Sequence, residues 1–326
     1  LPGTTWSRIA TTDVSDYGMA GVKNDGTLWT WARNYAGMLG QGETNQNKMY
    51  SSPVQVGTDA TWTTNISANN TQVIAAKTDG TLWSWGTNNN GAGAQNSTSY
   101  VYSPQQIPGT TWSTGDKKLV AFNGAWAIKT DGTMWAWGYN QKGGIGSNNK
   151  VNYSSPIQIP GTTWNQVDSS SYTSNLATKT DGTLWVAGRN RYGQLGQNNL
   201  TEYSSPIQIP GTTWDQISGG YEWGIGTKTD GTLWSWGSNS YGSLGQNNQT
   251  KYSSPTQIPG TTWNTVSALY NSTIALKTDS TMWMWGRNYG ILGQNNETHY
   301  SSPVQIPGTW NNIFVGKSFA FGLKNN

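Results

Sequence analysis

The sequence predicts an all-β protein of the β-propeller class, because short phrases recur along the whole chain at nearly constant spacing. Asp-Gly-Thr-(Leu/Met)-Trp starts at Asp25, Asp79, Asp131, Asp181 and Asp230, and at Asp279 with Ser280 in place of glycine. A phrase similar to Gly-Thr-Thr-Trp ends at Trp6, Trp62, Trp112, Trp164, Trp214, Trp263 and Trp310. A repeat of about 50 residues with about four short strands has the size of one propeller blade. An open solenoid is the alternative.

Each repeat is predicted to contain strands and turns only. A short strand such as residues 274–277 runs into Thr-Asp, and Asp-Gly then supplies the positive φ angles of a tight hairpin. The next strand, for example residues 232–237, carries two tryptophans two positions apart and therefore on one face. A loop rich in Gly and Asn, followed by Tyr-Ser-Ser-Pro, leads to an outer strand such as residues 207–209.

The tryptophans are the predicted core. The chain has 20 Trp against 4 Phe, and most of the Trp fall at repeated positions. Burial removes 150–250 Å² of each indole from water, which stabilises a fold by roughly 4–6 kcal/mol as an upper bound. Blades that splay from an axis leave wedges that such side chains fill, so a closed ring is favoured over a solenoid. Trp126 and Trp223 stand outside the repeat pattern and are expected to be less buried.

Seven blades are predicted, with the last one incomplete in this chain, and six blades are the alternative. The strand that ends in lysine occurs seven times, at Lys23, Lys77, Lys129, Lys179, Lys228, Lys277 and Lys324, but the Asp-Gly-Thr-Leu-Trp strand occurs only six times. Residues 1–326 are expected to form a single propeller domain. We expect the edge at Phe319–Lys324 to be a joint, covered by a longer native chain, by the stretch Leu1–Thr5 or by another subunit in a homo-oligomer or larger assembly.

Composition argues against several classes of function. There is no Cys, and His299 is the only histidine, so most metal-ligand sets and nucleophile–base pairs are missing. Charged residues make up 11% of the chain and the net charge is +3, without a basic run of the kind that binds nucleic acid. No apolar run is long enough to span a membrane. We therefore expect a non-enzymatic protein with no cofactor, no catalytic metal, no nucleic-acid partner and no membrane insertion.

The loop that precedes each lysine strand is the predicted binding face, because it varies while the rest of the repeat does not. Tyr and Trp are over-used there, as in protein and glycan contact surfaces. The candidate residues are Tyr17, Asn70, Trp126, Tyr172, Tyr221, Trp223, Tyr270 and Phe319. Relaxed packing of surface loops is the alternative reading. The loop after the Trp strand, for example residues 189–192 and 287–289, is a second candidate surface.

Two further repeated features have structural readings. An asparagine follows the Trp strand in every complete repeat, at Asn34, Asn88, Asn140, Asn190, Asn239 and Asn288, where it is expected to cap a turn. Six of the seven lysines precede an aspartate by two positions, so their charges are expected to cancel at the hairpin.

Residues 184–196, Leu-Trp-Val-Ala-Gly-Arg-Asn-Arg-Tyr-Gly-Gln-Leu-Gly, resemble the regulator of chromosome condensation repeat, as do residues 274–279. The histidine that this family usually places five residues before the lysine is missing from every repeat, and Trp223 occupies one of these positions. The resemblance covers essentially the whole chain and implies a seven-bladed propeller. Its members include exchange factors for small GTPases, chromatin-binding proteins and bacterial inhibitors that cap an enzyme with one face of the ring.

Two functions follow as expectations. The first is an interaction or structural module that binds protein or glycan in a cell-surface, virion or secreted assembly, which implies an extracellular or virion-associated location, with a cytoplasmic one open. The alternative is an intracellular regulator of a small GTPase or a chromatin-binding propeller.

Overall fold

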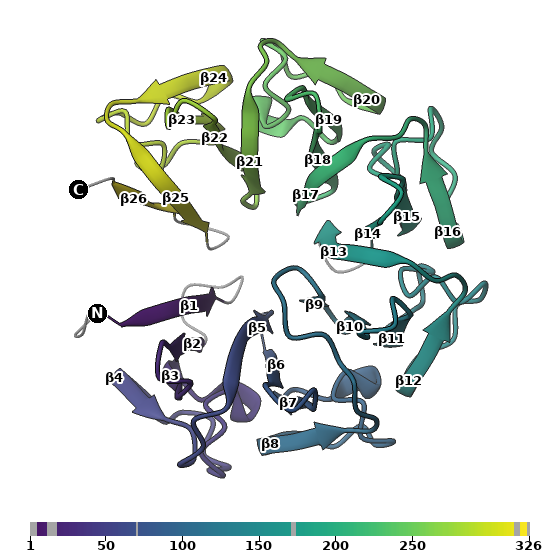
Figure 1. Cartoon of the computed structure of the whole chain (residues 1–326), viewed down its shortest axis with the longest axis vertical. Coiled ribbons are helices and arrows are strands. Elements are labelled where there is room, and N and C mark those ends of the chain that lie inside the picture. Colours follow the sequence, from purple (N-terminus) through teal and green to yellow (C-terminus); the bar gives the residue numbers. More distant parts are fainter. Residues whose placement is uncertain (1–4, 12–17, 70, 171–173, 316–319, 325–326) are drawn as a thin grey trace. The chain divides into compact units, whose positions relative to one another are not determined.

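Every sheet of the molecule is an antiparallel meander in which consecutive strands are neighbours (Figure 1). The computed structural model describes residues 5–11, 18–69, 71–170, 174–315 and 320–324. These residues form six four-stranded sheets and one two-stranded sheet. Helix among them is limited to the 3₁₀ turns η1 (Tyr35–Gly37), η2 (Asn89–Gly91) and η4 (Ser240–Gly242). The all-β prediction is confirmed.

The contacts of the chain fall into two units, which we describe separately. The first unit comprises Leu1–Gln141 and Asn149–Val167, and the second comprises Lys142–Asn148 and Asp168–Asn326. The single-domain expectation stays a prediction. We call the four strands of each sheet A to D in chain order, so that an AB loop joins the first two strands and a CD loop joins the last two.

The first unit contains three sheets. Their strands are β1 (Trp6–Thr11), β2 (Met19–Lys23), β3 (Leu28–Arg33), β4 (Met49–Gln55); β5 (Trp62–Ala68), β6 (Gln72–Lys77), β7 (Leu82–Gly86), β8 (Val101–Ile107); β9 (Leu119–Ala121), β10 (Gly124–Ile128), β11 (Met134–Gly138) and β12 (Tyr153–Ile159). The next strand, β13 (Trp164–Ser170), begins in the first unit and ends in the second.

The second unit continues the same pattern. Its strands are β14 (Ser174–Lys179), β15 (Leu184–Gly188), β16 (Tyr203–Ile209); β17 (Trp214–Gly220), β18 (Trp223–Lys228), β19 (Leu233–Gly237), β20 (Tyr252–Ile258); β21 (Trp263–Ala268), β22 (Ser272–Lys277), β23 (Met282–Gly286), β24 (Tyr300–Ile306); β25 (Trp310–Val315) and β26 (Ala320–Lys324). Strand β13 completes the sheet that contains β14 to β16.

The turn between the B and C strands satisfies its own polar groups. The Oδ1 atom of Asp230 accepts hydrogen bonds from the backbone N–H of Thr232 at 2.9 Å and from its hydroxyl at 2.6 Å. Hydrogen bonding, first from the Thr232 hydroxyl, holds the pKa of Asp230 below its usual range. The Thr232 hydroxyl in turn accepts the indole N–H of Trp234 at 2.8 Å. Lys228 lies over the same indole, with its Nζ 4.5 Å from the ring centroid. The lysine therefore makes a cation–π contact in addition to its electrostatic attraction to Asp230.

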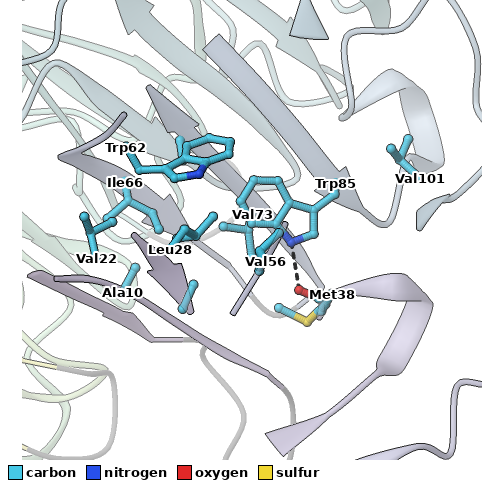
Figure 2. Packing of buried hydrophobic residues seen from close by; sticks show 12 residues of the cluster. Ala10, Val22, Leu28, Met38, Val56, Trp62, Ile66, Val73, Trp85 and Val101 are labelled. Atoms are coloured by element: carbon cyan, nitrogen blue, oxygen red, sulfur yellow. Dashed lines mark hydrogen bonds between the residues drawn. The ribbon is translucent and has the colours of Figure 1, made fainter. Parts of the chain in front are cut away.

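Adjacent sheets are joined by the second tryptophan of the C strand. In the second unit the indole N–H of Trp236 donates to the backbone oxygen of Gln194 at 2.9 Å, in the CD loop of the preceding sheet. In the first unit Trp85 donates in the same way to Met38 at 2.8 Å, inside the apolar cluster that the two sheets share (Figure 2). Both indoles are at most 1% exposed. The bond therefore satisfies a polar group that burial would otherwise leave unpaired.

The equivalent contact of Trp285, whose indole N–H donates to the Ser243 carbonyl at 2.9 Å, requires a glycine in the loop. Gly245 adopts φ +68°, and a Cβ atom there would lie 2.8 Å from Nε1 of Trp285. Only the absence of a side chain lets the indole approach the loop this closely. In β15 the second tryptophan is replaced by Ala187, and the amide of Asn175 donates to the loop carbonyl of Gly144 at 2.8 Å instead.

A second contact ties each CD loop to the D strand of the following sheet. The N–H of Asn198 donates to the carbonyl of Ser253 at 2.7 Å, and that of Asn247 donates to Ser301 at 2.8 Å. Both acceptors lie in Tyr-Ser-Ser-Pro segments. The outer edge of the sheet thus receives a hydrogen bond from its neighbour, which explains why this phrase recurs with the repeat.

Mutation of the bridging tryptophan should test this arrangement. We expect Trp236→Ala to lower the free energy of unfolding by about 3–5 kcal/mol, because it removes a fully buried indole. Trp236→Phe should cost about 1–3 kcal/mol, since it leaves the Gln194 carbonyl unpaired and loses part of the ring. Tyr289→Ala, at an exposed position, should change stability by less than about 0.5 kcal/mol. Urea unfolding followed by circular dichroism measures all three, and equal losses at Trp236 and Tyr289 would contradict the assignment.

The last sheet has only β25 and β26 among the described residues. Trp310 is half-buried there, whereas its equivalent Trp263 is 3% exposed. Phe319 lies outside the described residues, and assembly through this edge stays a prediction. We expect light scattering on residues 1–326 to give a mass that rises above the monomer value with concentration; a monomer mass at every concentration would rule out self-assembly through this edge.

Candidate functional site

The two loop surfaces predicted from the sequence lie at the same edge of the sheets. The strands of each sheet are antiparallel, so AB and CD loops are at one end of the strands and the Asp-Gly turns are at the other. Side chains join the two kinds of loop directly. In the second unit Glu222 of an AB loop is within 3.5 Å of Arg189 and 3.3 Å of Arg191, both in the CD loop of the preceding sheet. We call this end of the sheets the AB–CD edge.

Of the predicted residues, Tyr221 and Tyr270 are brought together. Their rings stack at 4.3 Å between centroids with an interplanar angle of 16°, and the N–H of Tyr221 donates to the carbonyl of Tyr270 at 2.9 Å. Tyr270 is 37% exposed. The pair offers aromatic surface on neighbouring AB loops. The candidates Tyr17, Asn70, Tyr172 and Phe319 lie outside the described residues.

The expectation that Trp126 and Trp223 are poorly buried is wrong, because both are 0% exposed. Trp126 is in the middle of β10, paired with Ala136 of β11, at the position that Ile74 fills in β6. Trp223 begins β18, and its indole N–H donates to the Tyr270 carbonyl at 3.3 Å. Alignment of the B strands on their lysines would have identified Trp126 as a core position. Both tryptophans are buried within their sheets and do not form the surface of the AB–CD edge.

The repeated asparagines have the expected structural role through a different set of bonds. Asn190 is fully buried; its Nδ2 donates to the carbonyl of Asn199 at 3.0 Å, and its Oδ1 accepts the N–H of Leu195 at 2.9 Å. The bonds reach across the CD loop and do not cap a local turn. The same cross-loop bond recurs at Asn34, Asn88, Asn140, Asn239 and Asn288. Each CD loop is therefore pinned at its base while its tip is free to vary.

Glu222 is the most unusual charged group at this edge. Its side chain is 5% exposed and its backbone adopts φ 61°, a region that costs non-glycine residues about 1 kcal/mol or more. Burial raises the pKa of Glu222, and the charges of Arg191, Arg189 and Lys251 oppose this rise. A buried carboxylate with a shifted pKa, held in a strained backbone conformation, is a candidate functional group. The repeat pattern gave no signal for it, because the partners come from different repeats.

Two groups of cations and tyrosines lie at the AB–CD edge of the second unit. The ring of Tyr192 has the guanidinium of Arg191 4.4 Å from its centroid and the Nζ of Lys251 also at 4.4 Å. Arg287 approaches Tyr289 at 4.1 Å and Tyr241 at 5.0 Å in the same fashion.

His299 belongs to the second group, where a ring contact and a hydrogen bond hold its side chain in place. Its ring packs edge-on against Tyr241 at 5.0 Å between centroids, and its Nδ1 accepts the N–H of Asn288 at 3.0 Å. The described residues contain no group of three or more His, Cys, Asp or Glu that could hold a metal ion. They also contain no helix long and apolar enough to cross a membrane.

Apolar side chains are exposed at the AB–CD edge in both units. The exposed large hydrophobic residues of the described chain are Met49 at 65%, Val151 at 58%, Leu200 at 61%, Tyr270 at 37% and Tyr289 at 60%. All five belong to AB or CD loops or to the first residue after one. The Asp-Gly edge has no such residue within the part of the chain that the structure describes.

Three segments of the chain, residues 131–174, 181–223 and 230–276, match the regulator of chromosome condensation (RCC1) repeat. These three segments are RCC1 repeats, as the resemblance of residues 184–196 and 274–279 predicted. Human WBSCR16 is similar in structure, with a TM-score of 0.80 and 19% identity over 96% of this chain and 85% of that one. Prp20p from Saccharomyces cerevisiae has a TM-score of 0.79 and 17% identity, over 98% of this chain and 82% of that one, and a structure of yeast Kap60 bound to RCC1 (Prp20) gives 0.77. The predicted fold class is confirmed as an RCC1-like β-propeller.

The pH dependence of stability should reveal Glu222. A carboxyl whose pKa is higher in the folded protein than in the unfolded chain stabilises the fold when protonated, and this contribution is lost as pH rises through the folded-state pKa. We therefore expect Glu222→Gln to be at least as stable as the parent at neutral pH, with the difference shrinking on acidification. Urea unfolding at several pH values measures this, with Glu297→Gln, an exposed loop carboxylate, as control. A loss of stability at Glu222→Gln that is largest at neutral pH would show that the arginine pairs outweigh burial.

Proposed function

We propose that this chain is a non-enzymatic, protein-binding propeller that contacts its partner through the AB–CD edge of the second unit. The observation that carries the proposal is the placement of the exposed large side chains. Leu200, Tyr270 and Tyr289 are exposed at this edge, next to Arg191 and Arg287. Tyrosine and arginine are the residues that dominate protein interfaces, because they combine broad contact area with directed hydrogen bonds.

The opposite edge is a poor alternative for binding. Its aspartates, threonines and tryptophan N–H groups are already hydrogen-bonded to one another, and its lysines lie over indoles. A partner would have to break these contacts before making new ones. The AB–CD edge has a rigid base and varied, exposed tips, which is the arrangement of a binding face on a scaffold.

Similar proteins support protein binding over a role as structural material. The structure of Prp20p is described together with its binding to Gsp1p and histones, and yeast RCC1 (Prp20) has been solved with Kap60 bound. This favours a regulatory propeller over the surface or virion module that composition first indicated. The location of the protein stays a prediction.

Glycan binding is a weaker alternative. A polar cavity of about 180 Å³ in the first unit is lined by Asn69, Gln72, Asn89 and Asn123, amides of the kind that bind sugar hydroxyls. Its aromatic neighbour Phe122 is 2% exposed, so it offers no ring face on which a sugar could stack.

The test is to identify the partner and then localise its contact. The propeller would be used to capture proteins from an extract of its own source, and the identified partner would be purified and titrated against variants. We expect Tyr289→Ala with Tyr270→Ala to weaken binding by more than about tenfold, as for residues that anchor an interface. Thr261→Ala, exposed at the opposite edge, should leave the affinity unchanged. Equal effects at the two edges, with circular dichroism spectra unchanged, would refute the proposal.

A further inference from the structure

We propose that the AB–CD edge of the second unit recognises an acidic peptide segment of its partner, an inference that rests on the protein-binding function above. Five cations line this edge, and we call them the cationic row: Lys142, Arg189, Arg191, Lys251 and Arg287. The carboxylates in the same loops are Glu202, Glu222 and Glu297, which leaves two positive charges in excess.

Contacts between neighbouring loops make the cationic row continuous. Lys142 reaches Glu202 of the next CD loop at 3.9 Å. Glu222 then connects to Arg189 and Arg191, and Lys251 lies over Tyr192. Arg287 lies over Tyr241 of the preceding CD loop, 5.0 Å from the ring centroid. Because these contacts join neighbouring sheets, the cations form a single strip along four successive CD loops and are not scattered over the surface.

The cations keep unused capacity. A guanidinium has five N–H donors, and Arg287 donates to the Tyr289 hydroxyl at 2.7 Å. Among the described residues no carboxylate forms an ion pair with Arg287. The Arg191 side chain is 48% exposed and shares one carboxylate with Arg189. The row can therefore accept further carboxylates without giving up its internal bonds.

Glu222 sets the spacing of the row. Its buried carboxylate holds Arg189 and Arg191 side by side, and two arginines that share one anion keep a net positive charge toward solvent. The tyrosines beside the cations supply flat surfaces on which the backbone or apolar side chains of an extended peptide can lie. This combination suits a peptide that mixes acidic and apolar residues.

A nucleic acid fits these features less well. Its binding requires several phosphates to be neutralised at once, and the row offers an excess of only two charges. We therefore assign the surface to an acidic peptide and make nucleic-acid binding an outcome of the test.

The repeat supplies a matched control. Arg33, the last residue of β3, occupies the same position in its repeat as Arg189 and Arg287 in theirs. Its guanidinium is engaged within its own loop, where it donates to the Asn47 side chain at 2.9 Å and to the Gln46 carbonyl at 3.4 Å. Arg33→Ala thus removes the same residue type from an equivalent site that lacks the row.

The experiment uses the whole chain and a short fluorescein-labelled peptide of alternating Glu and Ser with one central Leu, followed by fluorescence anisotropy at low and at physiological ionic strength. We expect Arg191→Ala and Arg287→Ala each to weaken binding by about three- to fivefold, Arg191→Lys to restore part of the loss, and Arg33→Ala to change it by less than about twofold. A Lys-Ser peptide should not bind, and salt should weaken the acidic complex.

Three results would overturn the inference: no binding of the acidic peptide, equal losses at Arg33 and Arg191, or tighter binding of a labelled single-stranded oligonucleotide. Failure here is separable from failure of the proposed function. If Tyr270→Ala with Tyr289→Ala weakens binding of the captured partner while Arg191→Ala and salt do not, the edge is a protein interface that does not read acidic residues.

Discussion

The hydrogen bond from the second tryptophan of the C strand to the preceding CD loop is the contact on which the rest of the structure depends. A four-stranded sheet alone exposes one apolar face, and here Trp85 or Trp236 buries that face against its neighbour while the carbonyls of Met38 and Gln194 satisfy the indole N–H. The contact fixes the loop that carries the side chains proposed to bind a partner. Stability and the placement of the AB–CD edge are thus two results of one interaction.

Much of the fold could be predicted because the same sequence signals occur in every repeat. The lysine marks the end of the B strand, the Asp-Gly pair marks the turn, and the two tryptophans mark the C strand. The structure has these strands as β18, β19 and their equivalents. The burial of Trp126 follows from strand register, which a comparison of the loops does not show. When the strands are aligned, Trp126 lies at the position of Ile74 and Leu176. It is therefore a larger side chain at a position that is buried in each of these repeats.

The candidate site was predictable in position but not in chemistry. Variation between repeats points to the AB and CD loops, and the antiparallel topology places both at one end of the sheets. The contacts that give the site its character, such as Glu222 with Arg191 or Lys251 with Tyr192, join residues from different repeats. A comparison of repeats with one another cannot reveal such pairs, because each repeat contributes only one partner.

The docking of each CD loop onto the following sheet gives the molecule a direction. In most repeats the CD loop donates a hydrogen bond to the D strand of the following sheet and accepts the indole N–H of the second tryptophan of that sheet, as Asn198 with Ser253 and Gln194 with Trp236 illustrate. A copied repeat would therefore match its neighbours on both sides without compensating substitutions. A gene that encodes such repeats can lengthen by duplication of whole repeats, and this process would leave repeats that are nearly identical in sequence, as they are here.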